Sequence, residues 1–210
     1  MPSNKQYFTD ERELYDAAIE ELIKAKKTSR AKLSFFSKKS IVEQINERLL
    51  EGLLEQSVNN GFENFYICYQ PQIRGTDYTL DGVEALMRFR ANGVDYSPAQ
   101  FIPILEQLGL IHNAGIWVLK TALAQLAIWR EKLPNLRLNV NFSLGQFSDP
   151  NAIESVINVY KESHLPPHTL TVELTETVQV EDVEQIVTAT KTWQAAGIDV
   201  ALDDFGKGYS

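Results

Sequence analysis

Short apolar runs and longer amphipathic segments alternate along the second half of the chain. The runs LRLNVNFS, LTVELTE and IDVALDD have the length and side-chain alternation of β-strands. Between them, residues 150–164 and 180–196 have apolar side chains at helical spacing. Strands that alternate with helices of this length predict β/α units with parallel strand pairing.

Two earlier runs, FYICYQPQI and DGVEALMRF, predict a further pair of strands, and we expect Pro71 to weaken the far end of the first. A helix should begin after Ser97, because Pro98 is then its first residue and Gln100 its third. A longer helix, GIWVLKTALAQLAIWREKL, should run to Pro134. We thus count five strands in the chain.

The first sixty residues have a different pattern. Residues 9–27 and 40–60 predict two helices, joined by a basic segment without helical period. We interpret residues 1–39 as one piece, 40–61 as a linker helix, and 62–210 as a barrel-like domain.

Polar side chains recur on one face of several predicted strands. Asn139, Asn141 and Ser143 alternate with apolar residues, and Glu84, Leu86 and Arg88 share one face of their strand. Ordinary polar residues at strand ends would explain any one of these strands. Because parallel strands are usually apolar on both faces, the strands taken together favour a site at the carboxyl edge of the sheet.

Five polar residues of the predicted strands and their ends can bind a metal ion only through oxygen atoms. They are Glu84, Asn141, Glu173, Asp203 and Asp204. Hard oxygen ligands suit Mg²⁺, Mn²⁺ or Ca²⁺ and suit zinc or copper poorly. Four acids and an amide exceed what one Mg²⁺ usually takes from a protein, so we expect two ions. A two-ion site stabilises the attacking and leaving oxygens of a phosphoryl transfer.

Composition narrows the alternatives. A net charge of −8 argues against a nucleic-acid polymer or an anionic membrane as partner, although it also fits simple solubility. The single cysteine, Cys68, excludes an internal disulfide, and we expect it to be buried. The three histidines lack metal-ligand spacing. The chain as given shows neither a signal peptide nor a membrane-spanning run, so we expect a cytoplasmic protein.

Seven stretches follow one another along the chain: YQPQI, GVEALMRF, SPAQFIPILEQLGLI, WVLKTALAQLAIW, VNFS, VELTE and ALDDFGKGYS. In their order and spacing they resemble the EAL domain family, and the likeness extends throughout 62–210. The resemblance implies a modified TIM (β/α)8 barrel with an antiparallel first strand. It also implies a phosphodiesterase that opens cyclic di-GMP to linear pGpG with Mg²⁺ or Mn²⁺, and a homodimer formed near the ALDDFGKGYS segment.

Residue roles also follow from the resemblance. It implies that Glu84, Asn141, Glu173, Asp203 and Asp204 are metal ligands, and that Gln70, Leu86 and Arg88 contact the substrate. The catalytic set that it implies is Glu84, Asp203, Asp204 and Glu176, with Glu176 steadying the loop that begins at Asp204.

Residues 1–39 resemble the end of a GGDEF domain but contain no GG[DE]EF motif. Lys207 departs from the small residue, commonly threonine, that is usual in the family. A complete barrel typically needs about 250 residues, so we expect residues 1–210 alone to be inactive. Two alternatives to an enzyme stay open: a degenerate domain that binds cyclic di-GMP without cleaving it, and a scaffold that relays a signal.

Overall fold

The computed structural model describes residues 38–175 and 183–203. The chain divides into two compact units, Met1–Leu53 and Leu54–Ser210. The helix α2 (Lys38–Asn59) begins in the first unit and ends in the second. Our predicted boundaries at residues 39 and 61 stay predictions.

The second unit is built on one mixed β-sheet with the strand order β1-β2-β4-β5-β6. β1 pairs with β2 in antiparallel register, whereas the β2–β4, β4–β5 and β5–β6 pairs are parallel. The strands are β1 (Phe65–Ile73), β2 (Leu80–Ala91), β4 (Arg137–Phe142), β5 (Leu170–Thr175) and β6 (Asp199–Asp203). The predicted α/β fold with an antiparallel first strand is confirmed.

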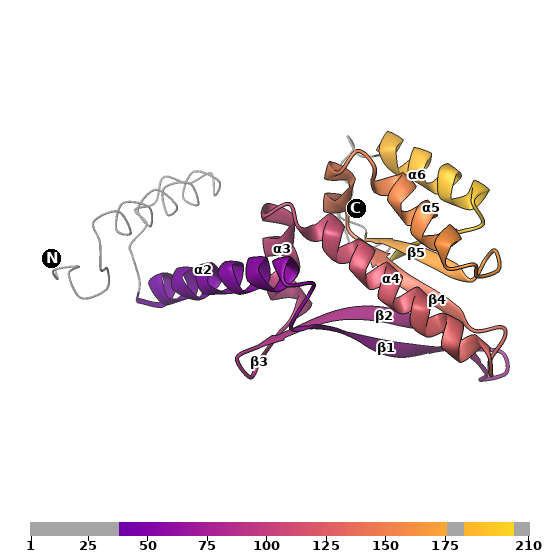
Figure 1. The fold of residues 1–210 in the computed structure, drawn as a ribbon, viewed down its shortest axis with the longest axis horizontal. Helices are drawn as coiled ribbons and strands as arrows, with labels where there is room; N and C mark the ends of the chain where they lie inside the picture. Colours follow the sequence, from indigo (N-terminus) through magenta and orange to yellow (C-terminus); the bar gives the residue numbers. More distant parts are fainter. Residues whose placement is uncertain (1–37, 176–182, 204–210) are drawn as a thin grey trace, which may run out of the picture. The chain divides into compact units, whose positions relative to one another are not determined.

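Helices cover one face of this sheet (Figure 1). They are α3 (Pro98–Gln107), α4 (Ile111–Arg130), α5 (Ala152–Glu162) and α6 (Val183–Ala195). Buried residues from α4, α5 and α6 form a continuous core with the strands, in which Leu126, Leu138 and Trp193 are fully buried. Burying about twenty apolar side chains there supplies the main stabilising term of the fold. None of the described helices has the length and apolar content to span a membrane.

Some local expectations were wrong. Pro71 does not weaken β1, which continues to Ile73 and pairs Pro71 with Val83. β1 is the terminal strand of the described sheet, where proline is tolerated because its missing N–H can face outward. Cys68 is exposed, because it lies opposite Leu86, on the face away from the helix-covered core.

Two short elements were not predicted from the sequence. β3 (Val94–Tyr96) pairs with the end of β2, and a 3₁₀ helix, η2 (Leu144–Ser148), follows β4 directly. The described residues therefore contain six strands rather than five, although the main sheet path still contains five. Three-residue strands and 3₁₀ turns are too short to give a hydrophobic period.

Candidate functional site

Two asparagines of β4 hold the glutamates of the neighbouring strands. Asn141 Nδ2 donates to Glu84 Oε1 of β2 at 2.7 Å, and Asn139 Nδ2 donates to Glu173 Oε1 of β5. All four residues lie on the face of the sheet away from the core, since Leu138, Val140 and Phe142 between and beside the asparagines are buried. The sheet therefore brings together three of the predicted ligands, Glu84, Asn141 and Glu173.

The predicted substrate contacts lie on the same face. Gln70 is the direct antiparallel partner of Glu84, and directly paired residues project to the same side of a sheet. Leu86 and Arg88 follow Glu84 at two-residue steps along β2. Arg88 Nη1 donates to the Met87 carbonyl at 2.9 Å. The alternation read from the sequence thus corresponds to one continuous polar face.

The remaining predicted residues are described less fully. Asp203 is the last residue of β6 and pairs with Thr175, the last residue of β5. It therefore lies at the carboxyl edge of the sheet, as expected. Glu176, Asp204 and Lys207 lie outside the described residues.

A cavity of about 300 Å³ adjoins Asn141 on the side of α3 and α4. Its volume lies at the lower end of the range for small-molecule sites. Apolar residues supply much of its wall, and the polar side chains that border it are Arg88, Glu106, Asn141, Ser143 and Gln146. The cavity thus opens beside the glutamate–asparagine pair and holds a few convergent polar groups.

The turn after β4 is fixed from both neighbouring helices. Ser143 caps η2, because its Oγ accepts from the Gly145 N–H at 3.1 Å, and the same hydroxyl donates to Glu106 Oε1 of α3. Gln146 is buried against α4, where an ideal Cβ added to Gly115 would lie 2.0 Å from its Oε1. Glycine at position 115 therefore makes room for this amide.

The donor set suits a hard cation, although the described part of the chain contains no cluster of three or more acidic, histidine or cysteine side chains. Glu84 and Glu173 offer carboxylate oxygens. The Asn141 hydrogen bond to Glu84 uses Nδ2, so Oδ1 is the atom that can face an ion. Oxygen donors of this type fit Mg²⁺ or Mn²⁺.

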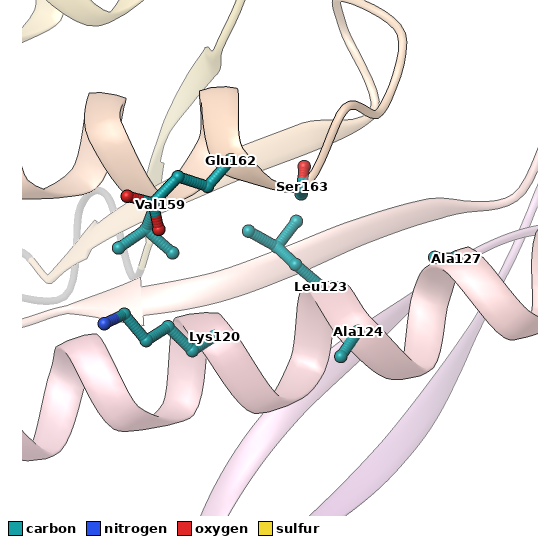
Figure 2. Close-up of a pocket in the computed structure, with 7 residues that line it drawn as sticks. All are labelled: Lys120, Leu123, Ala124, Ala127, Val159, Glu162 and Ser163. Atoms are coloured by element: carbon teal, nitrogen blue, oxygen red, sulfur yellow. The ribbon is translucent and has the colours of Figure 1, made fainter.

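A second hollow, of about 210 Å³, lies between α4 and α5 (Figure 2). Its wall is mainly apolar, formed by residues such as Leu123 and Val159, and Lys120 and Glu162 both border it. Since it borders none of the predicted site residues, it is separate from the polar face of the sheet.

Two residues of the site, Glu106 and Gln146, were missed in the sequence, and Asn139 was placed on the polar face without a role. Its signal is the alternation with the core residues of β4, in step with Asn141. Glu106 and Gln146 have no such signal in the sequence, because their roles depend on how α3 and α4 pack beside the end of β4.

Comparison with known proteins identifies a family for this chain. Residues 53–210 match the EAL domain family. The cyclic di-GMP phosphodiesterase PA2567 of Pseudomonas aeruginosa is 35% identical over 149 residues, which cover 70% of this chain and 25% of the relative. The cyclic di-GMP phosphodiesterase PdeR of Escherichia coli is 36% identical over 174 residues, which cover 80% of this chain and 26% of the relative. The chain thus spans a small part of each of these relatives.

A solved structure, a PaMucR phosphodiesterase in complex with c-di-GMP, superimposes with a TM-score of 0.63 and 33% identity, over 70% of this chain and 63% of that one. The FimX EAL domain superimposes with a TM-score of 0.67 at 24% identity, over 76% of this chain and 64% of that chain, a likeness of fold alone. From the family match and these relatives, we conclude that the chain belongs to the EAL domain family.

Proposed function

We propose that the protein hydrolyses cyclic di-GMP to linear pGpG with the help of Mg²⁺ or Mn²⁺. The observation that carries this proposal is the Asn141–Glu84 hydrogen bond, which joins two oxygen-donor residues on adjacent parallel strands. Family membership and the phosphodiesterase names of the relatives support the choice of nucleotide.

The proposed ligands come from four strands and the residue that follows the last. Asn141 Nδ2 donates to Glu84, so Oδ1 is the atom of this amide that would bind a cation. Glu173 is steadied in turn by Asn139. A bound divalent cation supplies charge neutralisation and an acidified water to phosphodiester hydrolysis. The proposed ligand set is Glu84, Asn141, Glu173, Asp203 and Asp204, arranged for two ions.

The chain's own residues would hold the nucleotide beside these ligands. The guanidinium of Arg88 can neutralise a phosphate oxygen through charge-assisted hydrogen bonds, and its side chain borders the cavity next to Asn141. Leu86 lines the same cavity, and Gln70 pairs with Glu84 at the edge of the face. Water oxygen would bond to phosphorus while the bond from phosphorus to O3′ breaks, leaving a 5′-phosphate.

Other parts of the proposal concern residues outside the described ranges or properties of the whole protein. We propose that Glu176 steadies the loop that begins at Asp204, and that residues 1–39 end a GGDEF-like domain. We also propose a cytoplasmic homodimer. Because the described sheet path holds five strands against the eight of a TIM barrel, residues 1–210 alone should not catalyse.

Lys207 favours a second candidate function, a receptor that binds the nucleotide without cleaving it. A cation in the metal-adjacent loop would compete with a bound metal ion. Tight binding of cyclic di-GMP that needs no metal, without any product, would support the receptor.

The test is a chromatographic assay of cyclic di-GMP conversion by the full-length protein with Mn²⁺. The proposal predicts pGpG from the wild type and loss of product in Glu84→Ala. Glu154→Ala, at an exposed position on α5, is the matched control and should retain activity. Bound nucleotide without product from the wild type would contradict the enzyme and favour the receptor.

A further inference from the structure

Glu106 reaches the end of β4 from a helix that carries none of the proposed ligands. It lies in the last turn of α3, and its Oε1 accepts the hydrogen bond of Ser143 Oγ. Ser143 is two residues beyond Asn141, at the point where β4 turns into η2. The contact therefore joins α3 to the backbone turn that directly follows the proposed ligand.

The Ser143 hydroxyl holds both sides of this turn at once. It donates to Glu106 and accepts from the Gly145 N–H at 3.1 Å. A Cβ added at Gly145 would lie 3.0 Å from both Cγ and Oε1 of Glu106, so the carboxylate side chain packs directly on the turn. Since one hydroxyl makes both bonds, loss of the Glu106 carboxylate would leave the Ser143 hydroxyl without the acceptor of its O–H. The Ser143 side chain would then be free to rotate.

The end of β4 at Asn141 is held from several sides. Phe142, between Asn141 and Ser143, is buried and packs on Phe147 and Trp193, so the strand end has little freedom on the core side. On the opposite side, Asn141 is fixed by Glu84. The hydrogen bond from Ser143 to Glu106 adds a third contact, from α3, to the residues that directly follow Asn141.

We infer that Glu106 is a positioning residue for the proposed metal site, acting through Ser143 on the orientation of Asn141. This inference rests on the proposed function. Outer partners of metal ligands fix ligand orientation, and their removal typically weakens metal binding about 10- to 100-fold. Glu106 itself touches neither Asn141 nor Glu84 through a hydrogen bond in the described structure.

The test measures Mn²⁺ binding by the full-length protein, from the electron paramagnetic resonance signal of the free ion, together with KM and kcat for cyclic di-GMP. Glu106→Ala and Ser143→Ala should each weaken Mn²⁺ binding about 10-fold. The double variant should be no worse than Glu106→Ala, because both changes remove the same contact. Glu106→Gln keeps an acceptor oxygen and should restore binding. Gln107→Ala, the next residue of α3, is the matched control.

Three results would overturn the inference. Unchanged Mn²⁺ binding in both alanine variants would show that the contact does not position the ligand. A raised KM in Glu106→Ala that Glu106→Gln does not rescue would make Glu106 a substrate contact instead. A wild-type protein that binds no Mn²⁺ would contradict the proposed function and this inference together, whereas unchanged variants of a binding wild type contradict the inference alone.

Discussion

Asn141 of β4 donates a hydrogen bond to Glu84 of β2 at 2.7 Å, joining residues 57 positions apart in the chain. The donor is the amide nitrogen, so this bond does not use the amide oxygen. A carboxylate and an amide fixed in this way present two oxygen ligands at one edge of a parallel sheet, where ligands of α/β proteins usually bind.

Asn141→Asp tests this pair. The substitution removes the N–H donor and sets two carboxylates against each other, so the metal-free protein should lose about 1 kcal/mol of stability. Mn²⁺ should then raise the melting temperature of the variant more than that of the wild type, because a cation relieves the repulsion. Asn135→Asp, at an exposed position before β4, is the control. Equal Mn²⁺-induced shifts in Asn141→Asp and the wild type would count against a shared ion.

Arg88→Ala should raise KM for cyclic di-GMP about 10- to 100-fold, since a charge-assisted hydrogen bond to phosphate contributes about 1.5–3 kcal/mol. Arg88→Lys should recover part of the loss, because lysine keeps the charge without the bidentate geometry. Steady-state kinetics measure both variants.

Arg90 provides the matched control for Arg88. It lies two residues further along β2 and pairs with Asp95 of β3 through Nε and Nη2, away from the cavity. Arg90→Ala should therefore leave KM unchanged. If Arg88→Ala behaved like Arg90→Ala, Arg88 would not be a substrate contact.

The close approach of Gly115 to Gln146 predicts that Gly115→Ala changes the free energy of unfolding in opposite directions in the wild type and in a Gln146→Ala variant. In the wild type, Gly115→Ala places a Cβ 2.0 Å from Gln146 Oε1 and should destabilise the protein by about 1–2 kcal/mol, because the buried amide has little room to move. In a Gln146→Ala background the same change should stabilise α4 by about 1 kcal/mol through helix propensity. Urea denaturation measures both free energies of unfolding.

Gly52→Ala is the reference for helix propensity alone, since nothing lies within 4 Å of a Cβ added there. It should stabilise the protein by about 1 kcal/mol. Stabilisation by Gly115→Ala in the wild-type background would mean that Gln146 adapts without cost.

The β2–β3 hairpin predicts a pH dependence. Hydrogen bonds from Arg90, at 2.6 and 2.9 Å, hold the pKa of Asp95 below its ordinary value. A carboxyl with a lowered pKa in the folded state stabilises the fold above its unfolded pKa, about 3.9, and this stability is lost as pH falls through the folded pKa.

Asp95→Asn should accordingly lower the melting temperature at pH 7, and the difference from the wild type should shrink as pH falls below about 4. Thermal unfolding followed by circular dichroism measures it. In an Arg90→Met background the difference should shrink to the smaller part that the hydrogen bond from Tyr66 to Asp95 supplies. A difference that grows on acidification would contradict the assignment.

The helices and strands of this fold could be predicted from the sequence because each buries one face, which gives its apolar residues a regular spacing. Val140, Val172 and Leu174 alternate with polar residues, and that period identifies both the strands and the polar face that carries Asn141. The order of the parallel strands follows from the β/α repeat. The antiparallel β1 and the identity of the family came from resemblance of motifs rather than from periodicity.

Contacts between distant elements could not be predicted in this way. Glu106 meets Ser143 because α3 and the end of β4 pack together, and neither residue stands in a pattern that signals the partner. Cys68 looked like a core residue by type, yet it projects to the polar face. It lies three residues after the buried Phe65, and residues an odd number of positions apart on a strand face opposite sides. Which face of a strand is buried depends on tertiary packing.

If the site adds water to a phosphodiester, a single turnover in ¹⁸O-labelled water should transfer one labelled oxygen to the product. Full-length protein with Mn²⁺ is mixed with less than one equivalent of cyclic di-GMP, and the mass of the product is measured by mass spectrometry. We predict pGpG carrying one labelled oxygen on its 5′-phosphate, because water oxygen bonds to phosphorus as the bond to O3′ breaks. Unlabelled product, or intact cyclic nucleotide after binding, would mean that the protein does not hydrolyse cyclic di-GMP by attack of water on phosphorus.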